Sequence, residues 1–241
     1  MKLKHFSFAL LLLANSAFAQ QADLVSYVNT LQGTNSKHEL TRGNTYPTTA
    51  LPFGMHTWTP QTGKNGDGWK YQYFLDKIRG FQQAHQCSSW TRDYAVFSLM
   101  PMTELVVDEN KREARFSHNN EIAKPNYYKV TFDNKITTEI APSERGAHLR
   151  FTYPSGGKSF LVLDGYNRTS GVKIFPKENK ITGWVSNGQG FKNNWKSYFV
   201  IQFDQPIIAY GTWDNKSNRC CQILCLQRVE VKELILSSNQ G

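Results

Sequence analysis

The residues best suited to binding chemistry lie between Gln82 and Met102, in the segment QQAHQCSSWTRDYAVFSLMPM. Trp90 has no apolar residue within two positions, whereas rings of a core usually alternate with other apolar residues. An imidazole (His85) and a carboxylate (Asp93) lie near it along the chain. A sugar presents an apolar C–H face and a rim of hydroxyls, so this combination of side chains indicates a carbohydrate site.

A purely structural role explains the same residues equally well. Asp93 could cap a backbone turn and Trp90 could cover the edge of a sandwich, and the residue types do not decide between the two interpretations. Two similar segments of polar and aromatic residues occur earlier, GNTY at 43–46 and GDGW at 66–69. For Trp58 and Trp69, packing is the favoured interpretation.

No complete catalytic set emerges from the spacing of residues. The chain has no Gly-x-Ser-x-Gly elbow, no His-Glu-x-x-His and no phosphate-binding glycine loop. Asp93 has no evident second carboxylate, and Asp67, Glu104 and Asp164 are candidates only as any carboxylate would be. Cys220, Cys221 and Cys225 lack the spacing of a zinc site.

The first 20 residues, MKLKHFSFALLLLANSAFAQ, have the features of a bacterial secretory signal. A basic start, a short apolar run and Ala-Phe-Ala before Gln20 predict cleavage after residue 19 and export to the periplasm or medium. The apolar run is too short for a stable membrane anchor. The net charge is +9, but lysine and arginine are scattered, which argues against a nucleic-acid groove.

The elements that must position these residues are strands. The segment 127–140 is a hairpin pattern with Asp133-Asn134 at its turn, and 148–165 is a second one folded at 154–157. Strand-like runs follow at 180–190 and 197–213. Apolar residues alternate with polar ones at Val130, Phe132, Leu149, Phe151, Leu161 and Leu163. We therefore predict an all-β fold, an antiparallel β-sandwich or strongly curved sheet over about 115–215.

Residues 30–95 differ, because they are rich in Gly, Asn, Thr, Pro and Trp. Polar loops of this length in a compact domain are usually functional. No repeat or low-complexity linker divides the chain, so one domain over 20–216 is expected, with long N-terminal loops on one side.

The ordered motifs of the first half resemble the N-terminal domain of glycoside hydrolase family 92. The resemblance spans roughly residues 24–215. It rests on GNTYP at 43–47, PFGM at 52–55, GDGW at 66–69, and the series His85, Trp90, Asp93-Tyr94. One departure is Cys87-Ser88-Ser89, where relatives often carry Pro-Ser-Pro, and this could loosen the loop.

The resemblance implies an exported, calcium-dependent, inverting exo-α-mannosidase, with α-1,2-linked mannose as the expected substrate. In the family, a β-sandwich (supersandwich) precedes an (α/α)6 barrel, and the active site lies between them. Trp90 would be the platform for the leaving-group sugar, and the Gly43-Asn44 loop would approach the terminal mannose. The substrate-binding candidates are thus Gly43, Asn44, Trp69, His85, Trp90 and Asp93.

The same resemblance places the general acid, the general base and the calcium ligands mainly in the barrel, which these 241 residues do not include. No catalytic or metal-binding residue is therefore predicted in this chain. Its partners would be mannose-containing glycans and the barrel domain. The alternatives to this enzyme-domain function are a stand-alone carbohydrate-binding module or a gene fragment without a role. Without the barrel, Trp58, Trp69 and Trp90 are expected to expose aromatic area.

The last residues, 217–241, form an unusual tail with three cysteines in six residues. Family members would continue with sandwich strands here, and Val229-Glu230-Val231-Lys232 has the pattern of one. We expect a reading-frame disturbance or gene fragmentation near residue 218, followed by premature termination, with an irregular tail that packs poorly from 219 onward.

Overall fold

The computed structural model describes residues 23–37, 39, 45–63, 70–84, 97–165, 170–186, 196–214, 220–226 and 229–237. The predicted signal segment 1–19 lies outside these ranges. Fifteen strands and two short 3-10 helices, η2 (Leu24–Tyr27) and η4 (Pro176–Glu178), are found in them. Every strand pairing is antiparallel, as the all-β prediction required.

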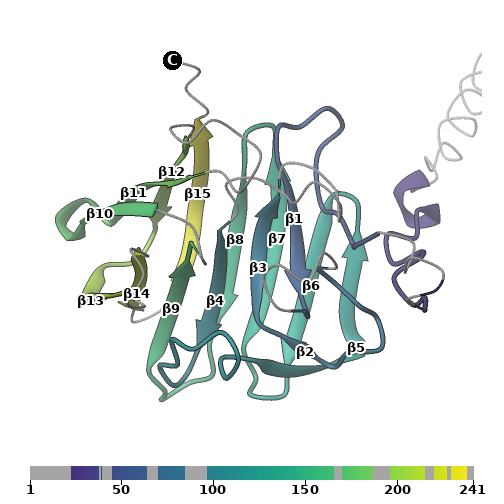
Figure 1. Cartoon of the computed structure of the whole chain (residues 1–241), viewed down its shortest axis with the longest axis horizontal. Helices are drawn as coiled ribbons and strands as arrows, with labels where there is room; N and C mark the ends of the chain where they lie inside the picture. Colours follow the sequence, from purple (N-terminus) through teal and green to yellow (C-terminus); the bar gives the residue numbers. More distant parts are fainter. Residues whose placement is uncertain are drawn as a thin grey trace, which may run out of the picture.

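The strands form two sheets that face each other (Figure 1). The six-stranded sheet has the order β1 (Thr57–Gln61), β3 (Gly80–Ala84), β4 (Ser98–Met102), β9 (Ser159–Asp164), β14 (Cys220–Leu226), β13 (Ile207–Asp214). The nine-stranded sheet has the order β10 (Ser170–Phe175), β11 (Lys180–Ser186), β12 (Lys196–Phe203), β15 (Val229–Ser237), β8 (Gly146–Thr152), β7 (Thr137–Ser143), β6 (Tyr127–Phe132), β5 (Ala114–Lys124), β2 (Lys77–Ile78). This larger sheet is strongly curved, because β10 and β11 run across the direction of β6–β8 (Figure 1).

Aromatic side chains join the two sheets. The Phe81 ring of β3 lies 6.1 Å from the Tyr128 ring and 6.2 Å from the Phe132 ring, both on β6. The Phe97 ring, just before β4, lies 4.7 Å from the Phe199 ring of β12. All of these side chains are buried. The six residues whose alternation predicted the sandwich are buried as well.

The predicted hairpin at 127–140 is confirmed. Strands β6 and β7 pair with Tyr128 opposite Ile140 and Thr131 opposite Thr137. In the turn, Lys135 has φ 68°, and the Ile136 amide donates to Asn134 Oδ1 at 3.2 Å. The side chain of Asn134 thus replaces a backbone acceptor at this tight connection.

The predicted hairpin at 148–165 is wrong. Its two halves are β8 and β9, but β8 pairs with β7 and β15, whereas β9 pairs with β4 and β14. The Pro154–Gly157 turn therefore carries the chain from one sheet to the other. The Tyr153 hydroxyl donates to the Phe160 carbonyl at 2.7 Å and braces this crossing.

Two further expectations differ from the structure. Residues 30–95, which we expected to be loops, contribute β1, β2 and β3. The tail does not lack regular structure, because the backbone of β14 pairs between β13 and β9, and that of β15 between β12 and β8. The strand pattern noted at 229–232 lies in β15.

Replacing Phe81 with Ala should lower the free energy of unfolding by about 3–5 kcal/mol, because it removes the ring that joins β3 to β6. Urea denaturation measures this loss. The matched control is Ile208→Thr on the edge strand β13, where the side chain is exposed and the change should stay within about 0.5 kcal/mol. A loss below about 1 kcal/mol for Phe81→Ala would contradict the packing described here.

Candidate functional site

All six substrate-binding residues predicted from the sequence lie outside the described residues. They are Gly43, Asn44, Trp69, His85, Trp90 and Asp93. The structure therefore neither confirms nor contradicts their roles. It does place the residues that flank the three segments, and these flanks show where each segment leaves the sandwich.

The flanks of the first two segments meet. Tyr46 follows segment 40–44, and Lys70 follows segment 64–69. The Lys70 ammonium lies 5.4 Å from the centre of the buried Tyr46 ring. The Thr62 amide donates to the Lys70 carbonyl at 2.9 Å, which closes the base of segment 64–69. The segments that contain GNTY and GDGW are thus attached to the same part of the sandwich.

The third segment is attached elsewhere. It leaves β3 after Ala84 and returns at Phe97, and the Gln83 amide donates to the Phe97 carbonyl at 3.1 Å. Ala84 pairs with Thr57 at the start of β1, whereas segment 64–69 follows the end of β1. A strand of this length spans about 13 Å. The attachment points of the three segments on the sandwich therefore do not all lie at one place.

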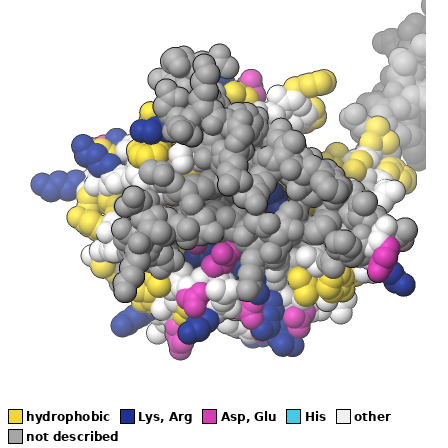
Figure 2. Space-filling model, in the orientation of Figure 1, with side chains coloured by type: hydrophobic (Ala, Val, Ile, Leu, Met, Phe, Trp, Pro, Cys, Tyr) yellow, Lys and Arg dark blue, Asp and Glu magenta, His cyan; other side chains and the backbone are white. Residues whose placement is uncertain are grey.

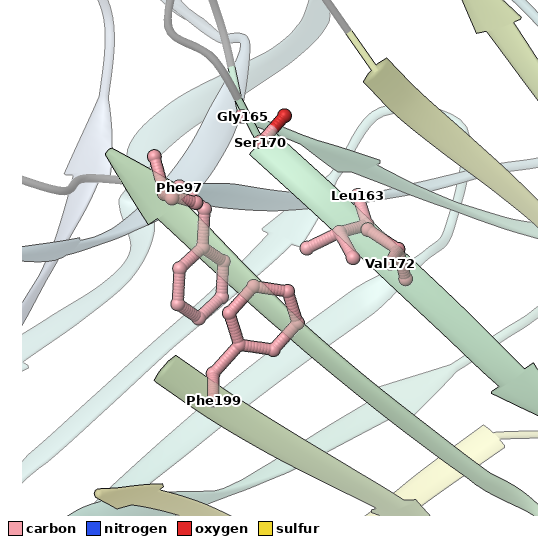
Figure 3. A pocket seen from close by; sticks show the side chains of 7 residues that line it. Phe97, Leu163, Gly165, Ser170, Val172 and Phe199 are labelled. Atoms are coloured by element: carbon pink, nitrogen blue, oxygen red, sulfur yellow. The ribbon is translucent and has the colours of Figure 1, made fainter. Parts of the chain in front are cut away.

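A small cavity lies between the sheets beside the Phe97 flank. Figure 3 shows the adjacent Phe97 and Phe199 rings on one side of it, with Leu163 and Val172 on the other side. Its volume is about 10 Å³, close to what one water molecule needs. The lining is apolar except for Ser170, so the cavity is a packing gap of the core and cannot hold a sugar ring.

A row of polar side chains crosses the other face of the six-stranded sheet. Thr59, Gln82, Ser98 and Asp164 are direct cross-strand neighbours on β1, β3, β4 and β9. They face away from the nine-stranded sheet, because the adjacent Phe81 points into the core. Each is no more than 5% exposed, so both faces of β1, β3, β4 and β9 are buried along this row.

The buried row ends in an ion pair. Asp164 pairs with Arg112, whose side chain is fully buried, and Arg112 also donates to the carbonyl oxygens of Arg79 and Val107. Asp164, a candidate carboxylate in the sequence, is thus committed to a buried cation. Glu104 is exposed, and Asp67 lies outside the described residues. We assign Asp164 a structural role.

The structure contains one polar cluster that sequence reasoning missed. It is centred on Glu121 of β5, whose side chain is 1% exposed. Its carboxylate accepts hydrogen bonds from the Tyr71 hydroxyl at 2.9 Å and the Tyr128 hydroxyl at 2.7 Å, and His118 Nδ1 lies 2.7 Å away. The His118 ring stacks on Tyr73 at 3.9 Å and donates from Nε2 to the Tyr73 carbonyl.

A β-bulge makes this cluster possible. Residues three apart on a regular strand point to opposite faces, so the spacing of His118 and Glu121 gave no signal. The register of β5 against β6 shifts between Phe116 and Glu121, which brings both side chains to one side. The cluster fastens residues 71–73 to the nine-stranded sheet, next to the segment that carries Trp69.

The two phenols of the cluster stay neutral. Burial, followed by the negative charge of Glu121, raises the pKa of Tyr71 and of Tyr128 far above its ordinary value. Both hydroxyls therefore remain donors to the carboxylate. With two phenols and an imidazole around it, Glu121 is fully engaged, and the cluster is a structural clamp and not a catalytic acid.

Metal ligands do not gather in the described residues. No group of three or more His, Cys, Asp or Glu side chains that could hold a metal ion is found among them. In the same part of the chain, no helix is long and apolar enough to cross a membrane.

Breaking the Arg112–Asp164 pair should be costly. Asp164→Leu leaves a buried, uncompensated guanidinium, and the expected loss in free energy of unfolding is about 3–5 kcal/mol by urea denaturation. The double variant Arg112→Met with Asp164→Leu removes both charges and should recover most of this loss. Losses that simply add would contradict the assignment of Asp164 to a structural pair.

Alkaline titration tests the tyrosine assignments. Burial and the hydrogen bond to Glu139 raise the pKa of Tyr127 to about 12. Between pH 10 and 12 the unfolded phenol loses its proton before the folded one, so this group makes stability fall as pH rises. Absorbance near 295 nm should show Tyr71 and Tyr128 ionising only with unfolding. Ionisation of either one near pH 10 in the folded chain would contradict the clamp, and Tyr71→Phe and Tyr128→Phe assign the signals.

Comparison with known proteins identifies the domain. The family model for the glycosyl hydrolase family 92 N-terminal domain matches residues 27–232. A family GH92 inverting mannosidase from Bacteroides thetaiotaomicron VPI-5482 is 36% identical, with a TM-score of 0.84. The match covers 90% of this chain and 32% of that one. A search of curated proteins returned no significant match.

A second solved structure shares the fold. A family GH92 α-mannosidase from Bacteroides thetaiotaomicron has a TM-score of 0.75 at 21% identity, and the match covers 90% of this chain and 33% of that one. The same enzyme is also known in complex with mannoimidazole, with a TM-score of 0.74. This chain spans about a third of the length of these relatives. The family match and the 36% identity together place the chain in glycosyl hydrolase family 92, as its N-terminal domain.

Proposed function

We propose that this chain is the sugar-contacting N-terminal domain of an exported, calcium-dependent, inverting exo-α-mannosidase. The enzyme would remove terminal mannose from glycans, with α-1,2-linked mannose as the first substrate to test. The observation that carries the proposal is the 36% identity to an inverting mannosidase over 90% of this chain. The N-terminal residues with the pattern of a signal peptide support export.

The sugar contacts would come from the three segments attached at the flanks described above. Trp90 would provide the ring on which the leaving-group sugar stacks, with His85 and Asp93 as hydrogen-bonding groups. Gly43 and Asn44 would approach the terminal mannose, and Trp69 would be a further substrate-binding residue. The pairing of Gln83 with Phe97 and the Tyr46–Lys70 contact support this role, because they fasten the bases of these segments to the core.

Bond cleavage would depend on residues outside this chain. Inversion needs an acid and a base about 6.5–9.5 Å apart on opposite faces of the sugar. The buried carboxylates of Asp164 and Glu121 are unsuited, because Asp164 pairs with Arg112 and Glu121 accepts from two phenols. We therefore expect the acid and the base in the further domains of the longer relatives.

Calcium would bind outside the described residues. The ion requires six to eight oxygen ligands, and this part of the chain gathers no group of even three His, Cys, Asp or Glu side chains. The described residues therefore do not fit a calcium site, and no step of the reaction is assigned to the ion here.

Titration with mannose oligosaccharides tests the proposal. A single exposed indole contributes only on the order of 1 kcal/mol, so the binding of the chain alone should be millimolar or weaker, and Trp90→Ala should abolish it. Ile208→Thr, at an exposed position of the edge strand β13, is the matched control and should change nothing. Micromolar binding lost in Trp90→Ala would favour a stand-alone carbohydrate-binding module instead.

Two other results would contradict the proposal. Absence of any binding would favour a fragment without a role. Turnover of α-1,2-mannobiose by the purified chain with calcium present would show that the acid and base lie within it.

A further inference from the structure

Lysines and aromatic rings gather on the outer face of strands β10, β11 and β12. Ile181 and Val185 of β11 and Phe199 of β12 are buried in the core. Side chains alternate along a strand, so the residues between them point the other way, and the register joins these outward positions across the three strands. We call the six of them that carry a charge or a ring the lysine face: Lys173, Phe175, Lys180, Trp184, Lys196 and Tyr198.

Each lysine of this face has its ammonium group against an aromatic ring of the same face. Lys196 Nζ lies 3.9 Å from the centre of the Trp184 ring. Lys173 Nζ and Lys180 Nζ lie 4.8 and 5.0 Å from the centre of the Phe175 ring. A cation is attracted to the face of a ring, so these contacts restrict side chains that otherwise keep much rotamer freedom. The rings therefore hold the ammonium groups in place on the surface of the sheet.

The position of the Trp184 ring depends on a glycine. Gly171 lies opposite Trp184 in the β10–β11 pair. A Cβ atom on Gly171 would lie 2.4 Å from Trp184 Nε1 and 2.8 Å from Cε2, so any larger residue would push the ring away. The indole thus leans over the backbone of β10 and is half-buried, instead of projecting into solvent.

The lysine face is positively charged. None of the outward positions of β10, β11 and β12 is acidic. Glu178 of η4 pairs with Lys180, but neither Lys173 nor Lys196 forms an ion pair with any described residue. Figure 2 shows lysine or arginine side chains beside hydrophobic ones at the end of the molecule where Figure 1 places β10 and β11. Cations that are held in place and lack a counter-charge attract anions.

The extent of the face indicates an elongated ligand. Phe175 lies opposite Lys180, and Trp184 follows Lys180 by four residues, so the two lysine-holding rings are about 13 Å apart along the strands. A single phosphate cannot reach both, but a chain of sugars with several negative groups can. Tyr198, 40% exposed, lies opposite Trp184 on β12 and offers a ring to the apolar face of a sugar.

Other polyanions fit this face less well. Binding in a membrane interface needs apolar side chains that enter the lipid, whereas Phe175 and Trp184 are half-buried and lie against ammonium groups. Phosphate recognition in nucleic acids typically uses arginine, and the outward positions of these three strands contain none.

We propose that the lysine face binds an acidic glycan, a polysaccharide with sulfate or carboxylate groups along its chain. Lys196 contacts an anionic group at one end of the face, and Lys173 with Lys180 contacts another at the other end. Tyr198 stacks on a sugar ring beside Lys196. No residue assigned to mannose takes part, so this proposal and the mannosidase proposal can fail separately.

Dextran sulfate and uncharged dextran test the proposal, because the two polymers differ only in their sulfate groups. Isothermal titration calorimetry of the purified chain should detect binding of the sulfated polymer and none of dextran. Lys196→Gln should weaken this binding about three- to fivefold. Lys135→Gln removes the same charge from an exposed position in the β6–β7 turn of the same sheet and should have no effect. Binding of polygalacturonate in place of dextran sulfate, with the same response to the variants, would support the proposal and identify the anionic group as a carboxylate.

Variants that keep every charge test the role of the rings. Gly171→Ala should displace the Trp184 ring and thereby release Lys196, so it should weaken binding of dextran sulfate about as much as Lys196→Gln. Trp184→Leu should do the same. Thermal melts show whether these two variants fold, and Lys196→Gln, which removes no core side chain, tests the site if they do not.

Several results would overturn the proposal. Equal losses in Lys196→Gln and Lys135→Gln would show an attraction to net charge alone, and equal binding of dextran would show that the anionic groups do not matter. Absence of binding to both anionic polymers would leave the face without this ligand. Tighter binding of double-stranded DNA or of phosphatidylglycerol vesicles, lost in Lys196→Gln, would assign the face to a different polyanion.

Discussion

Burial of strands β1, β3, β4 and β9 on both faces is the constraint on which the rest of this domain depends. One face packs its rings against the nine-stranded sheet, as Phe81 does against β6. The other face carries Thr59, Gln82, Ser98 and Asp164, which are buried although they are polar. Buried polar groups are costly unless they are paired, and a buried charge still more so. Arg112 is therefore required beside Asp164, and the chain between β4 and β5 must bring it there. The segment with His85, Trp90 and Asp93 begins after β3 and ends before β4, so this sheet also fixes where that segment starts.

The sequence predicted those parts of the fold that depend on local chemistry. The β6–β7 hairpin was predictable because Asp133 and Asn134 lie between two alternating runs, and the turn alone brings the strands together. The same logic failed for β8 and β9. Their turn residues show that the chain reverses, but they do not say whether it returns to the same sheet. Strands β1 and β3 were missed for a different reason. A strand buried on both faces has no alternation, and TWTPQ contains a proline and several polar residues that suggest a loop.

The candidate site, too, was predictable only in part. Its residue types suggested sugar binding, but the assignment of Trp90 and Asn44 to specific positions came from the resemblance to the family. No spacing rule could have assigned them, because three loops must converge in space for such a site to exist. The Glu121 cluster could not be predicted either. It combines residues 71 and 128 with a bulge that changes the direction of the side chains on β5, and neither feature has a short-range signature. Trp58 was a clearer case. Packing was favoured for it, and it is fully buried, with its ring 6.0 Å from that of Phe97. The expectation that it would expose aromatic area was therefore wrong.

The Glu121 cluster and the turn Leu51–Gly54 are both attached to the β5–β6 hairpin, but the Glu121 side chain is buried whereas that of Phe53 is exposed. Glu121 is satisfied by partners within the chain, so it fastens residues 71–73 to the nine-stranded sheet whatever lies outside. Phe53, in the turn Leu51–Gly54, has φ 60° and an exposed ring, so its side chain adds nothing to the core of the described residues. Both attach to β5 and its following turn, Glu121 through its side chain and the Phe53 loop through Pro125. The β5–β6 hairpin thus holds both the Glu121 cluster, whose hydrogen bonds are all made within the chain, and the exposed loop that contains Phe53.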